Sequence, residues 1–208
     1  MSMKIAKTTL AAALAAGLLA GTAQAYEAGN WIGRVGAWGV FPKSDNLSLA
    51  PGADLDVDNG YSLGFNFTYM VNPNIGVELI LALPFKHDIE LTGAGKVADT
   101  YQLPPTLFLQ YHFMPTGTVH PYVGVGLNYT FFFNEDGTGA LSGTDVSLDS
   151  SWGLAGELGV DLDVAPNWFV NATVMYMDID TKLKLDGVGV GTVTIDPWVI
   201  GLNIGTRF

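Results

Sequence analysis

The run from Asp54 to Gly60 is the first stretch whose residue types could bind a metal ion. It reads Asp-Leu-Asp-Val-Asp-Asn-Gly, and its alternating carboxylates resemble the start of a calcium-binding loop. The match fails at two positions, because the glycine comes one place late and the twelfth position is Phe65 instead of Glu. We therefore interpret the run as a solvated acidic loop, which could share divalent ions with neighbouring lipid phosphates.

Two other patterns are too incomplete to support catalysis. The segment Gly93-Ala94-Gly95-Lys96 lacks the full spacing of a phosphate-binding loop, and no helix is predicted after it. His87 adjoins Asp88 and His120 precedes Pro121, but no arrangement of His, carboxylate and Ser can be assembled from the spacing. The sequence predicts no catalytic residue, no metal site and no cofactor.

The elements that must position these residues show a two-residue alternation, which is the period of a β-strand. Between Tyr61 and Val71, aromatic and branched side chains occupy one face, and Ser, Gly, Asn and Thr occupy the other. The segment Trp198–Phe208 has the same pattern and stops on an aromatic residue. An open sheet would leave this edge exposed to aggregation, whereas a closed barrel pairs it with the first strand. The eight predicted strands centre on residues 31–38, 61–71, 75–83, 107–113, 123–131, 152–162, 170–177 and 198–208.

The connections between these strands alternate in length. Three are short and contain proline, and four are longer and acidic, at residues 43–58, 86–100, 134–147 and 180–190. Short turns at one end and long loops at the other are typical of an outer-membrane barrel. A soluble barrel would need a well-solvated outer face, but the second face is too small and uncharged for that role. We predict an all-β fold, an eight-stranded antiparallel transmembrane β-barrel with short periplasmic turns and longer extracellular loops.

Residues 1–25 have the features of a secretory signal peptide, with two lysines, a short apolar run and the small-x-small cleavage site Ala23-Gln24-Ala25. Residues 26–208 then form the barrel, with Tyr26 as the first mature residue. No later stretch approaches the roughly 20 apolar residues that a spanning helix needs. We therefore expect export to the outer membrane of a Gram-negative cell.

Composition and charge limit the function classes further. The 208 residues include no Cys, so no disulfide framework supports the exported chain. Charged residues make up only 14%, which is little for a soluble exported domain. Acidic residues exceed basic ones by 11, and by 13 once Lys4 and Lys7 are removed with the signal peptide. This excess of negative charge argues against binding nucleic acid.

Five charged residues fall on the face that we predict to line the lumen: Arg34, Glu78, Glu157, Asp161 and Arg207. An unpaired buried charge costs several kcal/mol. We therefore expect the two arginines to pair with these carboxylates, and any carboxylate left over to bind water. Such pairs would make the lumen narrow and charged at this level.

Three prolines flank the second long loop: Pro84 before it, and Pro104 and Pro105 after it. If the hairpin is centred on Ala94, Pro84 lies opposite Pro104. Proline cannot donate a hydrogen bond to the sheet, so these residues would weaken one seam of the wall and form a lateral opening. The alternative is that they only mark strand ends at the rim.

Several stretches spread over the mature chain resemble the outer-membrane protein W (OmpW) family, and its Pseudomonas-type branch in particular. The most specific are Phe67–Met70, Ile75–Leu79, Leu103–Leu107, Pro121–Thr130, Ser151–Gly153, Tyr176–Thr181 and Asp196–Val199. The resemblance implies an eight-stranded barrel that helps small, mainly apolar solutes to cross the outer membrane, with a side exit through its wall. It also implies an apolar channel constriction at Ile80 and Met175, both on the face already assigned to the lumen. A Trp often stands where this chain has Met175, and Met is slimmer and more flexible.

The sequence and the resemblance together predict a passive, monomeric channel for small hydrophobic solutes. Its expected partners are outer-membrane lipids and lipopolysaccharide, periplasmic chaperones, and the barrel-assembly machinery, for which the terminal Phe208 would be the assembly signal. Two alternatives stay open: a structural or stress-related surface barrel that transports nothing, and a lipid-modifying enzyme, because some small outer-membrane barrels are enzymes. Nothing in the sequence selects the solute.

Overall fold

The computed structural model describes residues 25–208, so the predicted signal peptide, 1–25, lies outside the described residues except for Ala25. Within 25–208 the chain is almost entirely β-structure, with one short 3-10 helix, η1 (Gly139–Leu141). No helix in this part of the chain is long and apolar enough to cross a membrane.

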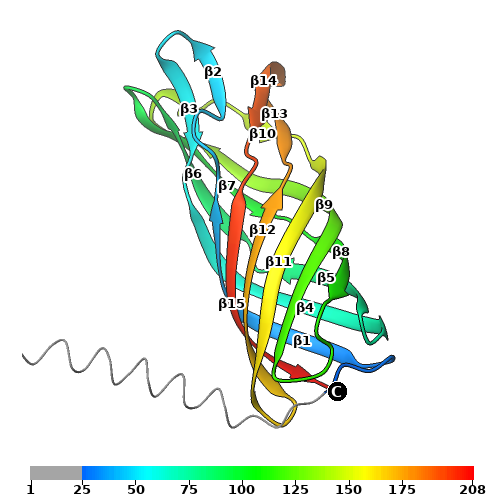
Figure 1. The fold of residues 1–208 in the computed structure, drawn as a ribbon. Coiled ribbons are helices and arrows are strands. Elements are labelled where there is room, and N and C mark those ends of the chain that lie inside the picture. The colour runs from blue at the N-terminus through cyan, green and yellow to red at the C-terminus, as the bar shows by residue number, and fades with distance from the viewer. Residues whose placement is uncertain (1–24) are drawn as a thin grey trace, which may run out of the picture.

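Eight antiparallel strands form the closed wall of a barrel, as the alternation predicted (Figure 1). The closing pair, β1 with β15, is in register from Ile32↔Arg207 to Phe41↔Trp198. β9 also pairs with β11, which completes the ring of wall strands. No wall strand is therefore left as an open edge. The wall strands are β1 (Trp31–Phe41), β4 (Gly60–Asn72), β5 (Ile75–Ala82), β8 (Thr106–His112), β9 (Val119–Gly137), β11 (Ser151–Ala165), β12 (Trp168–Met177) and β15 (Trp198–Arg207).

The two faces of the wall are the ones that the alternation predicted. Outward side chains such as Leu158 and Leu202 are 59% and 64% exposed, whereas inward Asn66 and Thr68 are 1% and 0% exposed. Aromatic residues stand exposed at both ends of the wall, in pairs such as Trp31 with Tyr69 and Tyr176 with Trp198, and exposed Trp152 packs against half-buried Tyr129. An apolar band between two aromatic girdles is the surface that a bilayer requires.

Three of the four long connections contain β-hairpins, which lie beyond the extracellular end of the wall (Figure 1). One group joins the top of β9 and includes β2 (Leu47–Ala50), β3 (Ala53–Val57), β6 (Phe85–Leu91) and β7 (Gly95–Leu103). A separate three-stranded sheet contains β10 (Val146–Leu148), β13 (Asp180–Leu185) and β14 (Val188–Thr194). These connections bury apolar residues such as Leu55, Ile89, Leu183 and Val193, although their composition is acidic. The C-terminus lies at the opposite end of the molecule (Figure 1).

The hairpin of β6 and β7 turns one residue earlier than predicted. Leu91 pairs with Gly95, so the turn is centred on Gly93 and not on Ala94. Gly93 and Gly95 both take positive φ angles, 80° and 72°, which glycine adopts at no steric cost. A bulge after Ile89 then shifts the register below the turn. This shift decides which residues face each other at the prolines.

Candidate functional site

Side chains fill the lumen in layers along the barrel axis. The inward residues of β1 show the order from the periplasmic end: Ile32, Arg34, Trp38 and Val40 are all buried. Arg34 lies in a charged layer, which also contains Glu78, Glu157 and Asp161. Trp38 lies with Ile80, Phe108 and Met175 in an apolar layer that belongs to one buried cluster. This layer is at the level of the predicted constriction, and we use that name for these four residues.

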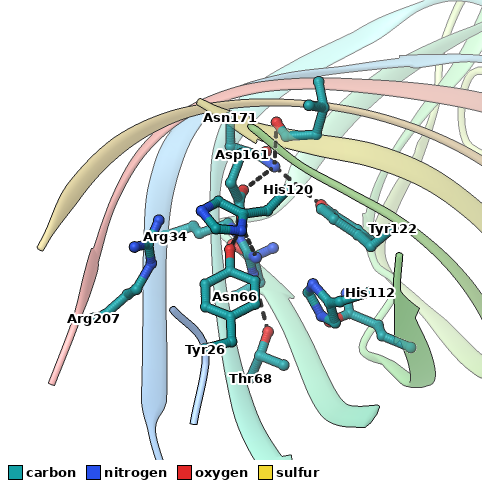
Figure 2. A network of polar contacts seen from close by, with 12 residues as sticks. Tyr26, Arg34, Asn66, Thr68, His112, His120, Tyr122, Asp161, Asn171 and Arg207 are labelled. Atoms are coloured by element: carbon teal, nitrogen blue, oxygen red, sulfur yellow. Dashed lines mark hydrogen bonds and ion pairs between the residues drawn. The ribbon is translucent and has the colours of Figure 1, made fainter. Parts of the chain in front are cut away.

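Arg34 is the centre of the charged layer (Figure 2). Its Nη2 and Nε donate to the two oxygens of Asp161 at 2.6 and 3.1 Å, a bidentate pair. Its Nη1 donates to Glu78 at 3.1 Å and to Thr68 at 2.9 Å. The side chains of Arg34, Glu78 and Asp161 are 0% exposed. Because Arg34 comes from β1, Glu78 from β5 and Asp161 from β11, these pairs tie distant parts of the wall together across the lumen.

Neutral polar and aromatic groups complete this layer. Asn171 donates to Asp161 at 2.7 Å and to the hydroxyl of Tyr122 at 3.0 Å (Figure 2). The guanidinium of Arg34 lies 5.3 Å from the ring centroid of Tyr122 and 5.4 Å from that of Phe169, within the range of cation–π contacts. The buried arginine is thus surrounded by acceptors and by aromatic faces.

The remaining predicted charges are arranged differently from the expectation. Glu157 has no basic partner within residues 25–208, and its Oε1 accepts a hydrogen bond of 2.7 Å from Gln110. Arg207 pairs with Asp163, which the sequence reading did not single out, with one contact at 3.2 Å. Asp163 also lies 3.3 Å from His120. Asp163 follows Asp161 on the inward face of β11, and the alternation could have identified it.

Tyr26 closes the periplasmic end of the lumen. Although it precedes the first strand, it is 1% exposed, and its hydroxyl donates to Asp161 (Figure 2). Its ring stacks on His120 with centroids 4.5 Å apart, and Arg207 lies 4.7 Å from the ring centroid. Its backbone nitrogen donates to the carbonyl of Pro115 at 2.8 Å. The sequence marked Tyr26 only as the first mature residue, and no periodicity could have placed it inside the barrel.

The residues predicted for the constriction, Ile80 and Met175, are 2% and 0% exposed and belong to the same apolar cluster. The prediction did not include Trp38, whose indole crosses toward β15 and donates to Asn203 at 2.7 Å. Gly64 makes room for this ring, because a Cβ there would lie 2.4 Å from the indole. The sequence does contain a signal for this contact, because Trp38 is an aromatic residue on the inward face and glycines lie on the inward faces of the neighbouring strands.

The prolines border an interruption in the wall. The β5–β8 ladder ends at Ile80↔Thr106, and the β6–β7 ladder starts at Phe85↔Gln102. Within the described chain no backbone pair joins 81–84 to 103–105, and we call this interruption the seam. Pro84 does not face Pro104 as predicted, because extending either register places Leu103 or Gln102 opposite Pro84. The cause is the earlier turn at Gly93 and the bulge that follows Ile89.

The carbonyl groups beside the seam accept hydrogen bonds from residues on the same side of it. The Pro104 carbonyl accepts from the Thr106 hydroxyl at 3.0 Å and from Asn128 at 3.3 Å. On the other side, the Ser62 hydroxyl donates to the Leu83 carbonyl at 3.0 Å. Proline has no N–H to satisfy. The two edges of the seam therefore expose fewer unpaired backbone groups than two ordinary strands would after separation.

Apolar side chains lie on both faces of the seam. Phe85 is 1% exposed and packs in the same cluster as the constriction, whereas Leu81 and Leu83 are 41% and 50% exposed on the outer surface. Pro84 is exposed and Pro104 is buried. The seam is therefore bordered by apolar side chains on its lumenal side and on its outer side.

Phe208 lies at the periplasmic end of the wall, 70% exposed. Its backbone N–H donates to the carbonyl of Trp31 at 2.9 Å, and its carbonyl accepts from the N–H of Trp31 at 2.8 Å. The side chain is thus presented outward by the closing pair of strands. The acidic run begins in β3, which ends at Val57, and continues to Gly60 at the start of β4. Among residues 25–208 no group of three or more His, Asp or Glu is placed to hold a metal ion.

Comparison with known proteins adds four findings. Residues 27–208 match the model of the OmpW family. The chain is 43% identical to outer membrane protein W of Salmonella typhi, over 97% of this chain and 99% of that protein. It is 31% identical to a Pseudomonas aeruginosa protein named "Dibenzothiophene metabolism operon protein PahQ", over 86% of this chain and 88% of that protein. The crystal structure of OprG from Pseudomonas aeruginosa is similar with a TM-score of 0.78 at 41% identity, covering 88% of this chain and 98% of that one.

Proposed function

Because the chain belongs to the OmpW family of outer-membrane β-barrels, we propose that it is a passive channel that carries small, mainly apolar solutes from the cell exterior into the hydrocarbon of the outer membrane. The solute enters at the extracellular end, reaches the constriction at Ile80 and Met175, and leaves through the seam beside Pro84, Pro104 and Pro105. The wall itself lies among outer-membrane lipids. The observation that carries the proposal is an interrupted ladder directly beside the apolar cluster of the lumen.

The periplasmic half of the lumen supports a lateral route. Below the constriction, Arg34, Asp161 and Glu78 are bonded across the lumen, and Tyr26 closes the end. An apolar solute would lose its favourable contacts in this layer and would gain nothing on reaching periplasmic water. Sideways movement keeps it in apolar surroundings. An intact wall forbids such movement, because unpaired backbone groups facing lipid cost several kcal/mol each.

One relative supports an apolar solute class. PahQ is named for an operon of dibenzothiophene metabolism, and dibenzothiophene is an aromatic compound without a charged group. An uncharged aromatic solute would suit the lumen of this chain above the charged layer, because aromatic and branched side chains such as Trp38, Ile80 and Phe85 line it.

The proposal is tested by delivery of an apolar probe through a lipopolysaccharide barrier. Vesicles with a lipopolysaccharide outer leaflet and the purified barrel are mixed with N-phenyl-1-naphthylamine, whose fluorescence rises in hydrocarbon. We expect a faster rise than in vesicles without the barrel or with an unrelated closed eight-stranded barrel. Equal rates in all three would favour a structural surface barrel, and turnover of labelled lipid would favour a lipid-modifying enzyme.

A further inference from the structure

The extracellular hairpins enclose a small cavity of about 20 Å³ above the constriction. Its lining residues come from β3, β6, β7 and β9 and from β10, β13 and β14. Most of the lining is apolar, including Leu55, Ile89, Phe132 and Leu183. Leu55, Ile89 and Leu183 belong to the same apolar cluster as Ile80 and Met175. The cavity therefore adjoins the apolar cluster through which the proposed solute passes. Two polar side chains of this lining, His87 and Gln102, are not accounted for by the channel.

His87 lines the cavity and carries an unused hydrogen-bond acceptor. It is 1% exposed, and its Nδ1 lies 2.6 Å from the carbonyl oxygen of Asp58. A carbonyl can only accept, so Nδ1 must carry the proton and Nε2 of the neutral ring has a free lone pair. Nε2 is buried and has no hydrogen-bond partner. Burial also lowers the pKa of His87, which keeps the ring neutral at pH 7.

Gln102 offers a donor beside this acceptor. It is 1% exposed, and its amide Nε2 is buried without a hydrogen-bond partner. In the β6–β7 ladder, Phe85 pairs with Gln102 and His87 pairs with Thr100. His87 and Gln102 are therefore diagonal neighbours, with about 7–8 Å between such positions, and both line the same cavity.

We propose that His87 and Gln102 form a recognition site for the polar head of an otherwise apolar solute, and that a hydroxyl group is the head that fits. A hydroxyl donates to the His87 Nε2 and accepts from the Gln102 amide, so one group satisfies both atoms. A plain hydrocarbon leaves both atoms unpaired, and a buried polar atom without a partner is unfavourable. The volume of the cavity suits a head group, and the tail follows the apolar cluster toward Ile80. This inference rests on the proposed channel function and narrows its substrate class to alcohols and similar monopolar molecules.

The site is tested by comparing 1-octanol with n-octane, which differ only in the hydroxyl. The barrel is placed in lipid nanodiscs and titrated with each probe at matched mole fractions in the lipid. Amide shifts of Thr100 and Leu183 report binding, and the ¹⁵N shift of the His87 imidazole reports a bond to Nε2. We expect 1-octanol to bind about tenfold more tightly than n-octane, as two neutral hydrogen bonds would give, and to move the Nε2 resonance.

Two variants separate the two atoms of the site. His87→Phe and Gln102→Leu keep an apolar side chain of similar size and should each reduce the preference for 1-octanol several-fold. Thr181→Val is the matched control, because this hydroxyl lies in the same lining but already donates to the carbonyl of Asp149. Its preference should remain that of the unmodified barrel. Heat-modifiable migration identifies the variants that are folded.

Equal binding of the two probes by the unmodified barrel would overturn the site. So would an unchanged preference in folded His87→Phe and Gln102→Leu. Both results leave the channel proposal intact, since that proposal fails only when the apolar probe crosses the lipopolysaccharide barrier no faster with the barrel than without it.

Discussion

Arg34 on β1 binds Asp161 on β11 through two hydrogen bonds of 2.6 and 3.1 Å that cross the interior of the barrel. The two strands are not neighbours in the wall, since β12 and β15 lie between them. Together with Glu78, this pair fills the lower lumen with bonded charged groups. In the proposed channel, the seam beside Pro104 is the route that avoids this layer.

Removing one partner of this pair should destabilise the barrel strongly. Arg34→Leu leaves Asp161 buried without its cation, and breaking a buried pair in this way costs about 3–5 kcal/mol. The double variant Arg34→Leu with Asp161→Leu should lose clearly less than the sum of the two single losses. Urea unfolding in lipid vesicles measures all four proteins, and additive losses would reject a direct interaction.

Tyr26 should contribute to stability through its hydroxyl. Tyr26→Phe keeps the ring stacked on His120 but removes the donor to Asp161, and a hydrogen bond to a charged group contributes about 1.5–3 kcal/mol. Its neighbour Glu27 is exposed, so Glu27→Ala is the control and should leave stability nearly unchanged. The urea midpoint of the mature protein reports both. A midpoint of Tyr26→Phe equal to that of the control would show that the hydroxyl bond is absent in the membrane.

Acid should weaken the extracellular end through His87, which lies beyond the membrane-spanning part of the wall. Burial lowers its pKa below the ordinary value of 6.5, although Asp58 and Asp88 oppose this shift. The folded state thus binds a proton less readily than the unfolded state. The stabilising contribution is complete above pH 6.5 and is lost as the pH falls through the lowered pKa of the folded state.

The measurement is hydrogen exchange of the β6 and β7 amides between pH 8 and 4, corrected for the intrinsic pH dependence of exchange. Protection should fall in the acidic part of this range, and His87→Phe should flatten the profile. The amides of β11 and β12, remote from His87, serve as the internal control. If protection of these amides depends on pH in His87→Phe as it does in the unmodified protein, the pH dependence comes from groups other than His87.

Deleting Phe208 should impair assembly in cells more than folding in vitro. The aromatic side chain is exposed at the end of the closing strand, where it makes little contact with the rest of the barrel. Heat-modifiable barrel recovered from outer membranes should therefore drop, while refolding of the same variant in detergent stays close to normal. Phe208→Tyr keeps the aromatic terminus and should assemble. Normal recovery of the deletion variant from cells would refute the role of an assembly signal.

The alternation of apolar and small polar residues was sufficient to predict the wall. In β4 and β15 the side chains on each face are the predicted ones, because a period of two leaves only one way to turn the apolar face toward lipid. The level of Arg34 and Glu78 in the lumen followed from the same alternation. What the alternation could not predict was which charges meet across the lumen, because that depends on the shear of the barrel.

Three features depended on contacts that no local pattern encodes. Tyr26 enters the lumen from outside the first strand, and only the closed barrel creates the pocket that it fills. The pairing of Pro84 was predicted incorrectly, because the turn centred on Gly93 moves its partner two residues away from Pro104 and the bulge after Ile89 moves it back by one. The long acidic segments were read as loops, although their apolar residues pair as strands above the membrane.

The side exit is tested most directly by locking the seam. Leu81 and Pro105 are the next residues after the pair Ile80↔Thr106, so the register places them opposite each other. The chain has no Cys, and Leu81→Cys with Pro105→Cys therefore introduces a single possible disulfide. The matched control is a disulfide between two fully paired wall strands, with Ala37→Cys and Leu63→Cys at a register pair of β1 and β4.

Delivery of N-phenyl-1-naphthylamine into lipopolysaccharide-coated vesicles is then measured for both variants, oxidised and reduced. The account predicts that oxidation slows delivery through the Leu81→Cys, Pro105→Cys barrel to the rate of vesicles without protein, that reduction restores it, and that the control barrel delivers the probe equally in both states. Unchanged delivery through the oxidised, folded seam variant would contradict exit between β5 and β8.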